Sequence, residues 1–127
     1  LEDLRLLTNY NMDSENRLTM LLMGQAELRR RISMAVHEPL AQRIVVRHHV
    51  TPLEPAELEP YLAHMLRLAG TELMLFEPAA QSAIYQATNG LVRKVNRLAH
   101  YALNAATQAK AKQVNADHVE AALPEVT

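Results

Sequence analysis

The hydrophobic pattern of the chain changes near Thr51. Before that point, Leu18–Met23 and Ile44–Val50 are short, largely apolar runs, and the second is rich in β-branched residues. Such runs are typical of parallel strands that are covered on both faces. A helix is predicted between them over residues 26–35, and another at the start of the chain over Leu1–Tyr10. Strand, helix and strand in this spacing predict a right-handed crossover unit of an α/β sheet.

After Thr51, the apolar positions recur at helical spacing in four segments joined by short connections. Pro60 falls inside the first of them and lacks the backbone donor that a helix interior needs, so a kink or a delayed start is expected there. Asn115 is a natural capping residue for the last segment. The predicted helices span residues 55–70, 76–88, 91–110 and 115–123.

The turn at Gly90 and the arginine that follows it carry the clearest chemical signal. Gly90 can adopt the left-handed conformation that ends one helix, so the next helix can begin almost at once at Leu91. Arg93 then stands in the first turn, where its charge opposes the helix dipole. Because helix stability does not account for a cation there, Arg93 is expected to bind an anion. Arg97 and Asn104 follow at four- and seven-residue steps on the same side.

Composition limits the class of protein. Hydrophobic residues make up 49% of the chain and aromatic residues only 4%, which favours a mainly helical domain or part of one. A net charge of -1 gives no global electrostatic case for a nucleic-acid binder, and the lack of cysteine excludes a disulfide framework. No apolar run approaches the length of a membrane span, so we expect no membrane contact by this segment and a cytoplasmic protein.

The turn at Gly90 together with Arg93 resembles the sensor-2 segment of AAA+ ATPases. In those proteins Gly-x-x-Arg opens a helix of the small helical lid, and the arginine reaches back to the nucleotide phosphates. Leu21–Leu28 and then Leu40–Ile44 precede this segment. That order resembles the ExeA-type ATPases of secretion systems and the TniB-like helper ATPases of transposons, and the resemblance covers most of the chain.

The resemblance implies a mainly α chain in which two short parallel strands remain from an α/β P-loop NTPase sheet, followed by a four-helix AAA+ lid. Residues 1–50 would be the distal part of the nucleotide-binding domain, and residues 51–127 the lid. The only glycines, Gly24, Gly70 and Gly90, lie in no phosphate-binding motif, and no apolar run ends in paired Asp-Glu. Walker A and Walker B are thus absent, and we expect a C-terminal fragment that is inactive alone.

The same resemblance gives roles to three residues. Gln25 follows a predicted strand, in the sensor-1 region that orients the attacking water; alternatively, it only caps the next helix. Arg43 corresponds to the arginine finger that enters the ATP site of a neighbouring subunit, with a surface ion pair to Glu38 as the alternative. Arg93 corresponds to the arginine that binds the nucleotide, with a solvated helix end as the alternative. Gln25 and Arg43 are therefore the predicted catalytic residues, and Arg93 the predicted cofactor-binding residue.

The remaining polar residues carry weaker signals. Arg47 is a second candidate for the finger, but in a strand it alternates with residues that face solvent. The run Arg29–Arg31 either faces solvent or contacts DNA phosphates. The six histidines show neither the spacing nor the companion carboxylates of a metal site, so none is expected.

The resulting hypothesis is the distal part of an AAA+ ATPase. The intact protein would bind ATP and Mg²⁺, form a homo-oligomer and remodel a partner, whereas this fragment would not bind nucleotide tightly. A transposon helper, with a transposase and DNA as partners, is slightly favoured over a secretion ATPase with secretion-system partners. The alternative of a different class is a stand-alone helical protein-interaction module without a nucleotide role.

Overall fold

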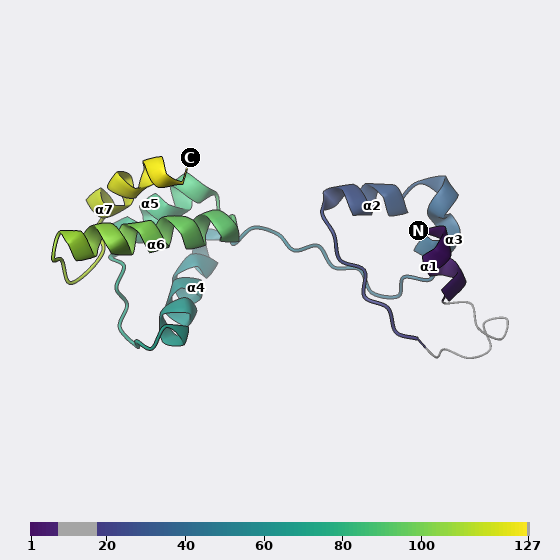
Figure 1. The fold of residues 1–127 in the computed structure, drawn as a ribbon, viewed down its shortest axis with the longest axis horizontal. Coiled ribbons are helices and arrows are strands. Elements are labelled where there is room, and N and C mark those ends of the chain that lie inside the picture. The colour runs from purple at the N-terminus through teal and green to yellow at the C-terminus, as the bar shows by residue number, and fades with distance from the viewer. Residues whose placement is uncertain (8–17, 127) are drawn as a thin grey trace. The chain divides into compact units, whose positions relative to one another are not determined.

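The computed structural model describes residues 1–7 and 18–126 (Figure 1). The chain divides into two compact units, Leu1–His49 and Val50–Thr127. The expected mainly helical class is confirmed, since the regular elements of the described residues are all helices. The predicted end of the first helix near Tyr10 lies outside the described residues. Within those residues, no helix is long and apolar enough to cross a membrane.

The first unit consists of short helices around α3. Its helix α3 contacts α1, α2 and the 3-10 helix η2. Leu40 of α3 is the buried apolar residue of this unit, with 4% of its surface exposed among the residues described. The elements are α1 (Glu2–Leu7), α2 (Ala26–Ile32), η2 (Ala35–His37) and α3 (Glu38–Ala41).

The two predicted parallel strands are not formed in the described part of the chain. Leu18–Met23 and Ile44–Val50 run as irregular backbone, and no ladder pairs them. Their apolar side chains are largely exposed, with 81% for Leu21 and 95% for Val45. A parallel strand needs neighbours that pair its backbone groups and layers that cover both faces. Neither is present around these segments in the described residues. The two runs therefore have the amino-acid composition of strands but are not paired with another strand.

The second unit contains four α-helices and a final 3-10 helix. Its longest helix, α6, packs against α5 and α7, and α4 packs against α5 (Figure 1). The elements are α4 (Pro55–Leu68), α5 (Pro78–Thr88), α6 (Val92–Gln108), α7 (Ala116–Ala122) and η3 (Leu123–Glu125).

Helical apolar stripes build the core of the second unit. Ile84, Val95 and Leu98 have none of their surface exposed, which places α5 and α6 at its centre. The stripes repeat every three or four residues, so each helix turns a single face inward. The main buried side chains are Leu58, Leu62 and Leu66 of α4, Ala80 and Ile84 of α5, Val95, Leu98, Ala102 and Ala106 of α6, and Val119 and Ala122 of α7.

Two loops of this unit are joined by backbone hydrogen bonds. Phe76, which precedes α5, forms a parallel bridge with Val114, which precedes α7. The Val114 N–H donates to the Leu75 carbonyl at 2.7 Å, and the Glu77 N–H donates to the Val114 carbonyl at 2.9 Å. The bridge fixes the starts of both helices, and the Phe76 side chain is buried in the core of the unit.

Pro60 lies inside α4 and does not delay its start. The helix begins at Pro55, because Glu54 and Glu57 form a capping box before Pro60 is reached. The Glu54 N–H donates to Glu57 Oε2 at 2.8 Å, and the Glu54 side chain accepts from the Glu57 N–H. Two donors at the helix start are thereby satisfied, which offsets the backbone donor that Pro60 lacks.

Candidate functional site

The turn between α5 and α6 contains two successive residues with positive φ. Asn89 has φ 49° and ends α5, and Gly90 has φ 72°. The Asn89 N–H donates to the Tyr85 carbonyl at 2.8 Å, and the Leu91 N–H donates to the Thr88 carbonyl at 3.1 Å. The left-handed Gly90 predicted from the sequence is therefore present, with Asn89 as a second left-handed residue before it.

The Gly90 backbone lies directly against Leu53, which precedes α4. The Leu53 N–H donates to the Gly90 carbonyl at 2.9 Å. A Cβ atom at Gly90 would lie 2.0 Å from the Leu53 carbonyl oxygen, a separation that no side chain tolerates. Glycine is thus required here for its conformation and for the close approach of another backbone segment.

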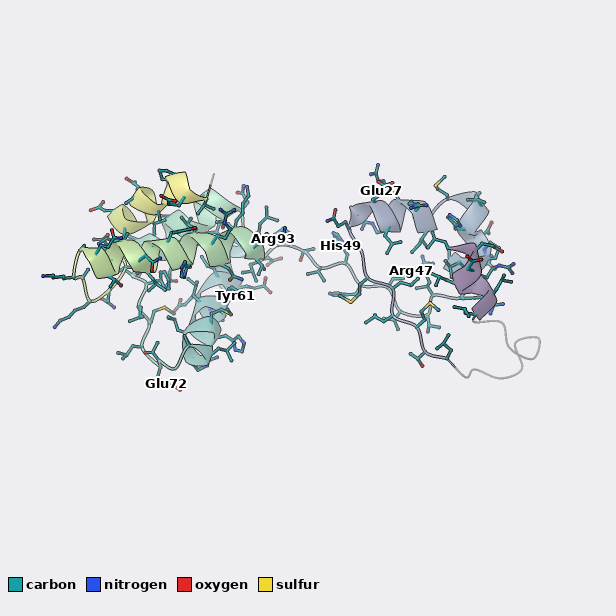
Figure 2. All side chains as sticks on the ribbon, in the orientation of Figure 1. Glu27, Arg47, His49, Tyr61, Glu72 and Arg93 are labelled. Carbon is teal, nitrogen blue, oxygen red and sulfur yellow. The ribbon has the colours of Figure 1, made fainter. Side chains whose placement is uncertain are left out.

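Arg93 is exposed in the first turn of α6 (Figure 2). Among the residues described by the structure, no carboxylate or carbonyl group pairs with its guanidinium. The N-cap residue Leu91 makes no side-chain hydrogen bond to the helix start, and the first turn contains no acidic residue. Planar guanidinium donors and the positive end of a helix dipole therefore coincide at this position, where they suit an anion that comes from outside the unit.

Arg97 and Asn104 have partners within the second unit. Arg97 Nη2 donates to the Glu125 carbonyl at 3.0 Å, which joins α6 to η3. The Asn104 side-chain amide lies 3.4 Å from His100 Nε2, one turn earlier on the same helix. Arg97 and Asn104 thus each contact another residue of the unit, whereas Arg93 has no partner among the described residues.

A charge pattern that the sequence analysis did not use strengthens this site. No Asp or Glu occurs from Pro78 to Ala116, whereas Arg93, Lys94 and Arg97 lie in the first half of α6. The carboxylates that would neutralise a cationic helix start are thus absent from that stretch. This gap between acidic residues can be read from the sequence alone, and it favours binding of an anion near the α6 N-terminus.

Gln25 is the N-cap residue of α2, but its side chain does not cap the helix. Its backbone is extended, with φ -76° and ψ 175°, and its side chain makes no capping hydrogen bond. The segment before it is not a strand, so Gln25 does not lie at a sheet edge in this structure. The sensor-1 role of Gln25 stays a prediction.

Arg43 follows α3 and is half-buried. Its backbone N–H donates to the Leu40 carbonyl at 3.0 Å, and the Glu38 side chain, its predicted alternative partner, accepts from Gln42 Nε2 at 3.2 Å. The arginine-finger role of Arg43 stays a prediction. The weaker candidate Arg47 has a local explanation, because its Nη2 donates to the Ala41 carbonyl at 2.6 Å and satisfies the end of α3.

Local contacts account for one arginine of the α2 run and for one histidine. Arg29, Arg30 and Arg31 are exposed in the last turn of α2, where cations favour the helix dipole, and Arg30 pairs with Glu27. His118 Nδ1 accepts from the Asn115 N–H at 3.1 Å and completes a capping box at α7. Within residues 1–7 and 18–126, no group of three or more His, Asp and Glu side chains is placed to hold a metal ion.

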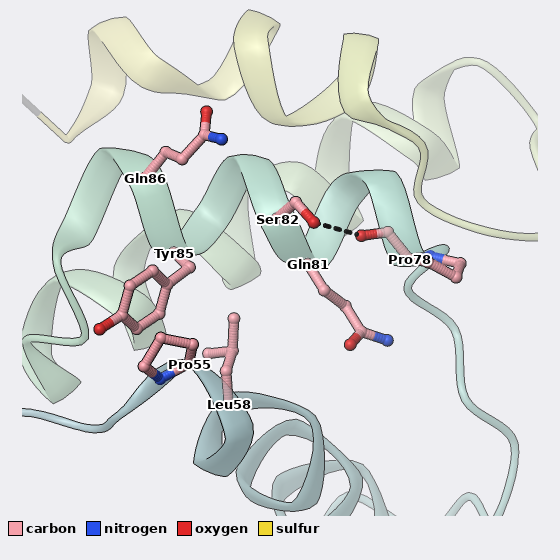
Figure 3. Close-up of a pocket in the computed structure, with 7 residues that line it drawn as sticks. All are labelled: Pro55, Leu58, Pro78, Gln81, Ser82, Tyr85 and Gln86. Carbon is pink, nitrogen blue, oxygen red and sulfur yellow. Dashed lines mark hydrogen bonds between the residues drawn. The ribbon is translucent and has the colours of Figure 1, made fainter.

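A shallow groove of about 360 Å³ separates the first turn of α4 from one face of α5 (Figure 3). Ser82 Oγ donates to the Pro78 carbonyl at 3.1 Å, and Gln81 Nε2 donates to the Phe76 carbonyl at 3.1 Å. No charged residue lines the groove, and Arg93 is not part of it. The lining residues are Pro55, Leu58, Pro78, Gln81, Ser82, Tyr85 and Gln86.

The fold and the site together define a helical module that presents an exposed arginine just after a glycine turn. Among known proteins, the chain is similar to the General secretion pathway protein A of Aeromonas hydrophila, with 36% identity over 106 residues. The matched region covers 84% of this chain and 19% of the relative, so the chain spans about one fifth of that protein's length. No family model matches the chain, and no solved structure matches it. The match supports the resemblance to ExeA-type proteins at this coarse level.

Proposed function

We propose that this chain is a portion of an ExeA-type AAA+ ATPase and that its second unit is the helical lid. The observation that carries the proposal is Arg93, which is exposed and unpaired among the described residues, three residues after the left-handed Gly90. In this account Arg93 binds the phosphates of a nucleotide held by another part of the protein. The similarity to General secretion pathway protein A over 84% of the chain supports it.

The chemistry of the α6 start suits a phosphate group. A guanidinium presents a planar fork of donors that matches two phosphate oxygens, and it keeps its charge at any physiological pH. The dipole of a 17-residue helix adds positive potential at the same end. Lys94 lies next to Arg93 and adds to the local charge, and no acidic side chain in the first turn opposes it.

The nucleotide site would be completed from outside this sequence. ATP and Mg²⁺ need the glycine-rich loop and the acidic strand end of a P-loop protein, and this sequence contains neither motif. Exposed apolar side chains in the first unit support a contact with the rest of such a domain. Leu21, Met23, Val45 and Val46 are each at least 80% exposed. Apolar segments of this kind favour burial, and we propose that they pair with strands of the remaining sheet.

The proposal assigns catalytic roles to Gln25 and Arg43. Gln25 would lie at the ligand edge of the completed sheet, where it would orient the attacking water. Arg43 would reach the nucleotide of a neighbouring subunit in a homo-oligomer and stabilise charge in the transition state of phosphoryl transfer. Hydrolysis would remodel a partner protein, and the relative's secretion-pathway name favours secretion-system partners over the transposase and DNA of the transposon branch.

Calorimetry with ATP and Mg²⁺ tests the proposal directly. Two proteins are compared: this chain, and the same chain extended upstream by about one half of a Rossmann-like domain. We expect binding by the extended protein and at most weak binding by the chain alone, because the P-loop supplies most phosphate contacts. No binding by either protein would refute the nucleotide role and favour a helical protein-interaction module.

A further inference from the structure

The region around Arg93, at the start of α6, is hydrogen-bonded to Leu53 and Tyr61 near the start of the second unit. We propose that two hydrogen bonds hold the Arg93 turn in its binding position, which makes Leu53 and Tyr61 positioning residues for the anion site. We also propose that anion binding by Arg93 increases the order of the segment Val50–Leu53. This inference rests on the proposed function of Arg93.

The first hydrogen bond joins Leu53 to the turn itself. The Leu53 N–H donates to the Gly90 carbonyl at 2.9 Å, three residues before Arg93. The Leu53 carbonyl oxygen would lie only 2.0 Å from a Cβ at Gly90, so the two backbones are in direct contact. The Leu53 side chain is half-buried and packs against the core of the unit. A shift of the turn would therefore break the hydrogen bond or displace Leu53.

The second hydrogen bond joins α4 to the flank of the same turn. Tyr61 Oη donates to Asn96 Oδ1 at 2.7 Å, and the two residues are 35 positions apart in sequence. Asn96 stands three residues after Arg93, so the two hydrogen bonds bracket Arg93 on either side in sequence. Both partners, Leu53 and Tyr61, belong to the segment that leads into α4 or to α4 itself.

Two fixed points on one turn restrict the Arg93 backbone to a narrow range of positions. A preorganised donor loses less conformational entropy when it binds, so its affinity is higher than that of the same donor on a mobile turn. The effect is reciprocal, because a ligand that stabilises the held position of the turn also stabilises the contacts that hold it. Bound anion should thus protect the Leu53 N–H from exchange with solvent.

The contact between Leu53 and Gly90 is tested by hydrogen exchange on this chain without ligand. Gly90→Ala introduces the Cβ clash and positive-φ strain, whereas the matched control Gly70→Ala, at φ 98°, introduces strain with no atom within 4 Å of its Cβ. We expect the Leu53 amide to exchange at least about tenfold faster in Gly90→Ala, as for a lost backbone hydrogen bond, and unchanged in Gly70→Ala. Equal Leu53 exchange in both variants would contradict the contact.

The Tyr61 hydrogen bond is tested by ATP affinity in the extended protein, because Tyr61→Phe removes only a hydroxyl group. We expect about threefold weaker binding for Tyr61→Phe and for Asn96→Ala, and no further loss in the double variant, since the two changes remove one hydrogen bond. Tyr85→Phe is the matched control and should bind as the wild type does. Additive losses, or wild-type affinity in both single variants, would overturn the positioning role of Tyr61.

The coupling has its own measurement. Saturating ATP should slow exchange of the Leu53 amide in the extended wild-type protein and leave it unchanged in Arg93→Ala. Unchanged Leu53 exchange in a wild-type protein that binds ATP would refute the coupling and leave the nucleotide role intact. If the wild-type protein does not bind ATP, the function proposed for Arg93 fails, and with it the role of Leu53 and Tyr61 in anion binding.

Discussion

Arg93 and Arg97 stand one turn apart on α6 and have different surroundings. Arg97 donates to the Glu125 carbonyl, whereas Arg93 has no partner among the described residues. An arginine that already satisfies a backbone carbonyl contributes to the fold, and one that is held in position without a partner is available to a ligand. We therefore expect Arg97 to contribute to stability and Arg93 to binding.

Arg97→Ala should lower the free energy of unfolding by about 1 kcal/mol, because it leaves the Glu125 carbonyl without its donor. The same substitution should leave the affinity of the extended protein for ATP within about twofold. Urea denaturation and calorimetry on the same preparations give both numbers. A large loss of ATP affinity together with unchanged stability would reverse the roles of Arg97 and Arg93.

Lys110 is the second residue other than glycine with positive φ in the described part of the chain, at 55°. It follows Ala109, the C-cap residue of α6, and the N–H of the next residue, Ala111, donates to the Ala106 carbonyl at 2.9 Å. Lys110→Gly should raise the free energy of unfolding by about 0.5–1 kcal/mol, because glycine adopts this conformation without a Cβ penalty. Lys112→Gly, at a residue without positive φ, is the matched control for urea denaturation. Stabilisation by both or by neither would contradict the explanation.

At the scale of elements, local signals predicted the helices of the second unit closely. The predicted segments 76–88 and 91–110 correspond to Pro78–Thr88 and Val92–Gln108. Apolar spacing, an N-terminal proline and a left-handed glycine all act over a few residues, so the sequence contains them directly. The contacts of Leu53 with Gly90 were not predictable, because they join segments far apart in the chain.

The prediction of two strands was wrong because strands, unlike these helices, do not depend on local signals alone. A strand depends on partners that lie elsewhere, and an apolar run such as Ile44–Val50 reports only that its side chains favour burial. The site followed the same division. Gly90 and Arg93 depend on local geometry, and they lie at a turn and at a helix start as predicted, whereas the binding role of Arg93 stays a prediction. Gln25 and Arg43 were assigned through a sheet edge and a subunit contact; the described residues form no sheet edge, and the subunit contact stays a prediction.

Asn115 tests the contribution of a cap to a short helix. Its side chain accepts from the His118 N–H at 3.1 Å at the start of α7, which has seven residues. Asn115→Ala should therefore cost about 1 kcal/mol of stability. Asn104→Ala on the exposed side of α6 should change the stability by less than about 0.5 kcal/mol. Equal effects of the two substitutions in thermal denaturation would argue against the cap.

At the scale of the whole molecule, the two units differ in how much core each contains. Most buried apolar residues lie in the second unit, and Leu40 is the buried one among those described in the first. The second unit, residues 50–127, should fold alone with a single cooperative thermal transition. Residues 1–49 alone should show no cooperative transition, because so small a core does not offset the entropy of folding. A cooperative transition of 1–49, or its absence in 50–127, would contradict this division.

The subunit contact proposed for Arg43 is tested by mixing variants of the extended protein. An Arg43→Ala subunit keeps its own nucleotide site, and a P-loop variant keeps its arginine, so a mixed oligomer contains some complete sites. We expect each variant alone to lose ATPase activity, by ~10³-fold or more if Arg43 is an arginine finger. The mixture should recover part of that activity. Mixtures no more active than their components would place Arg43 outside the neighbouring site.

The central claim is that Arg93 binds nucleotide phosphate, and calorimetry of Arg93→Ala with ATP in the extended protein tests it most directly. Lys94→Ala is the matched control, since it removes a neighbouring exposed charge from the same turn. We predict that Arg93→Ala weakens ATP binding by about tenfold or more, as for the loss of a charged hydrogen bond, and Lys94→Ala by no more than about twofold. Equal affinities of the two variants, with both folded, would contradict the claim.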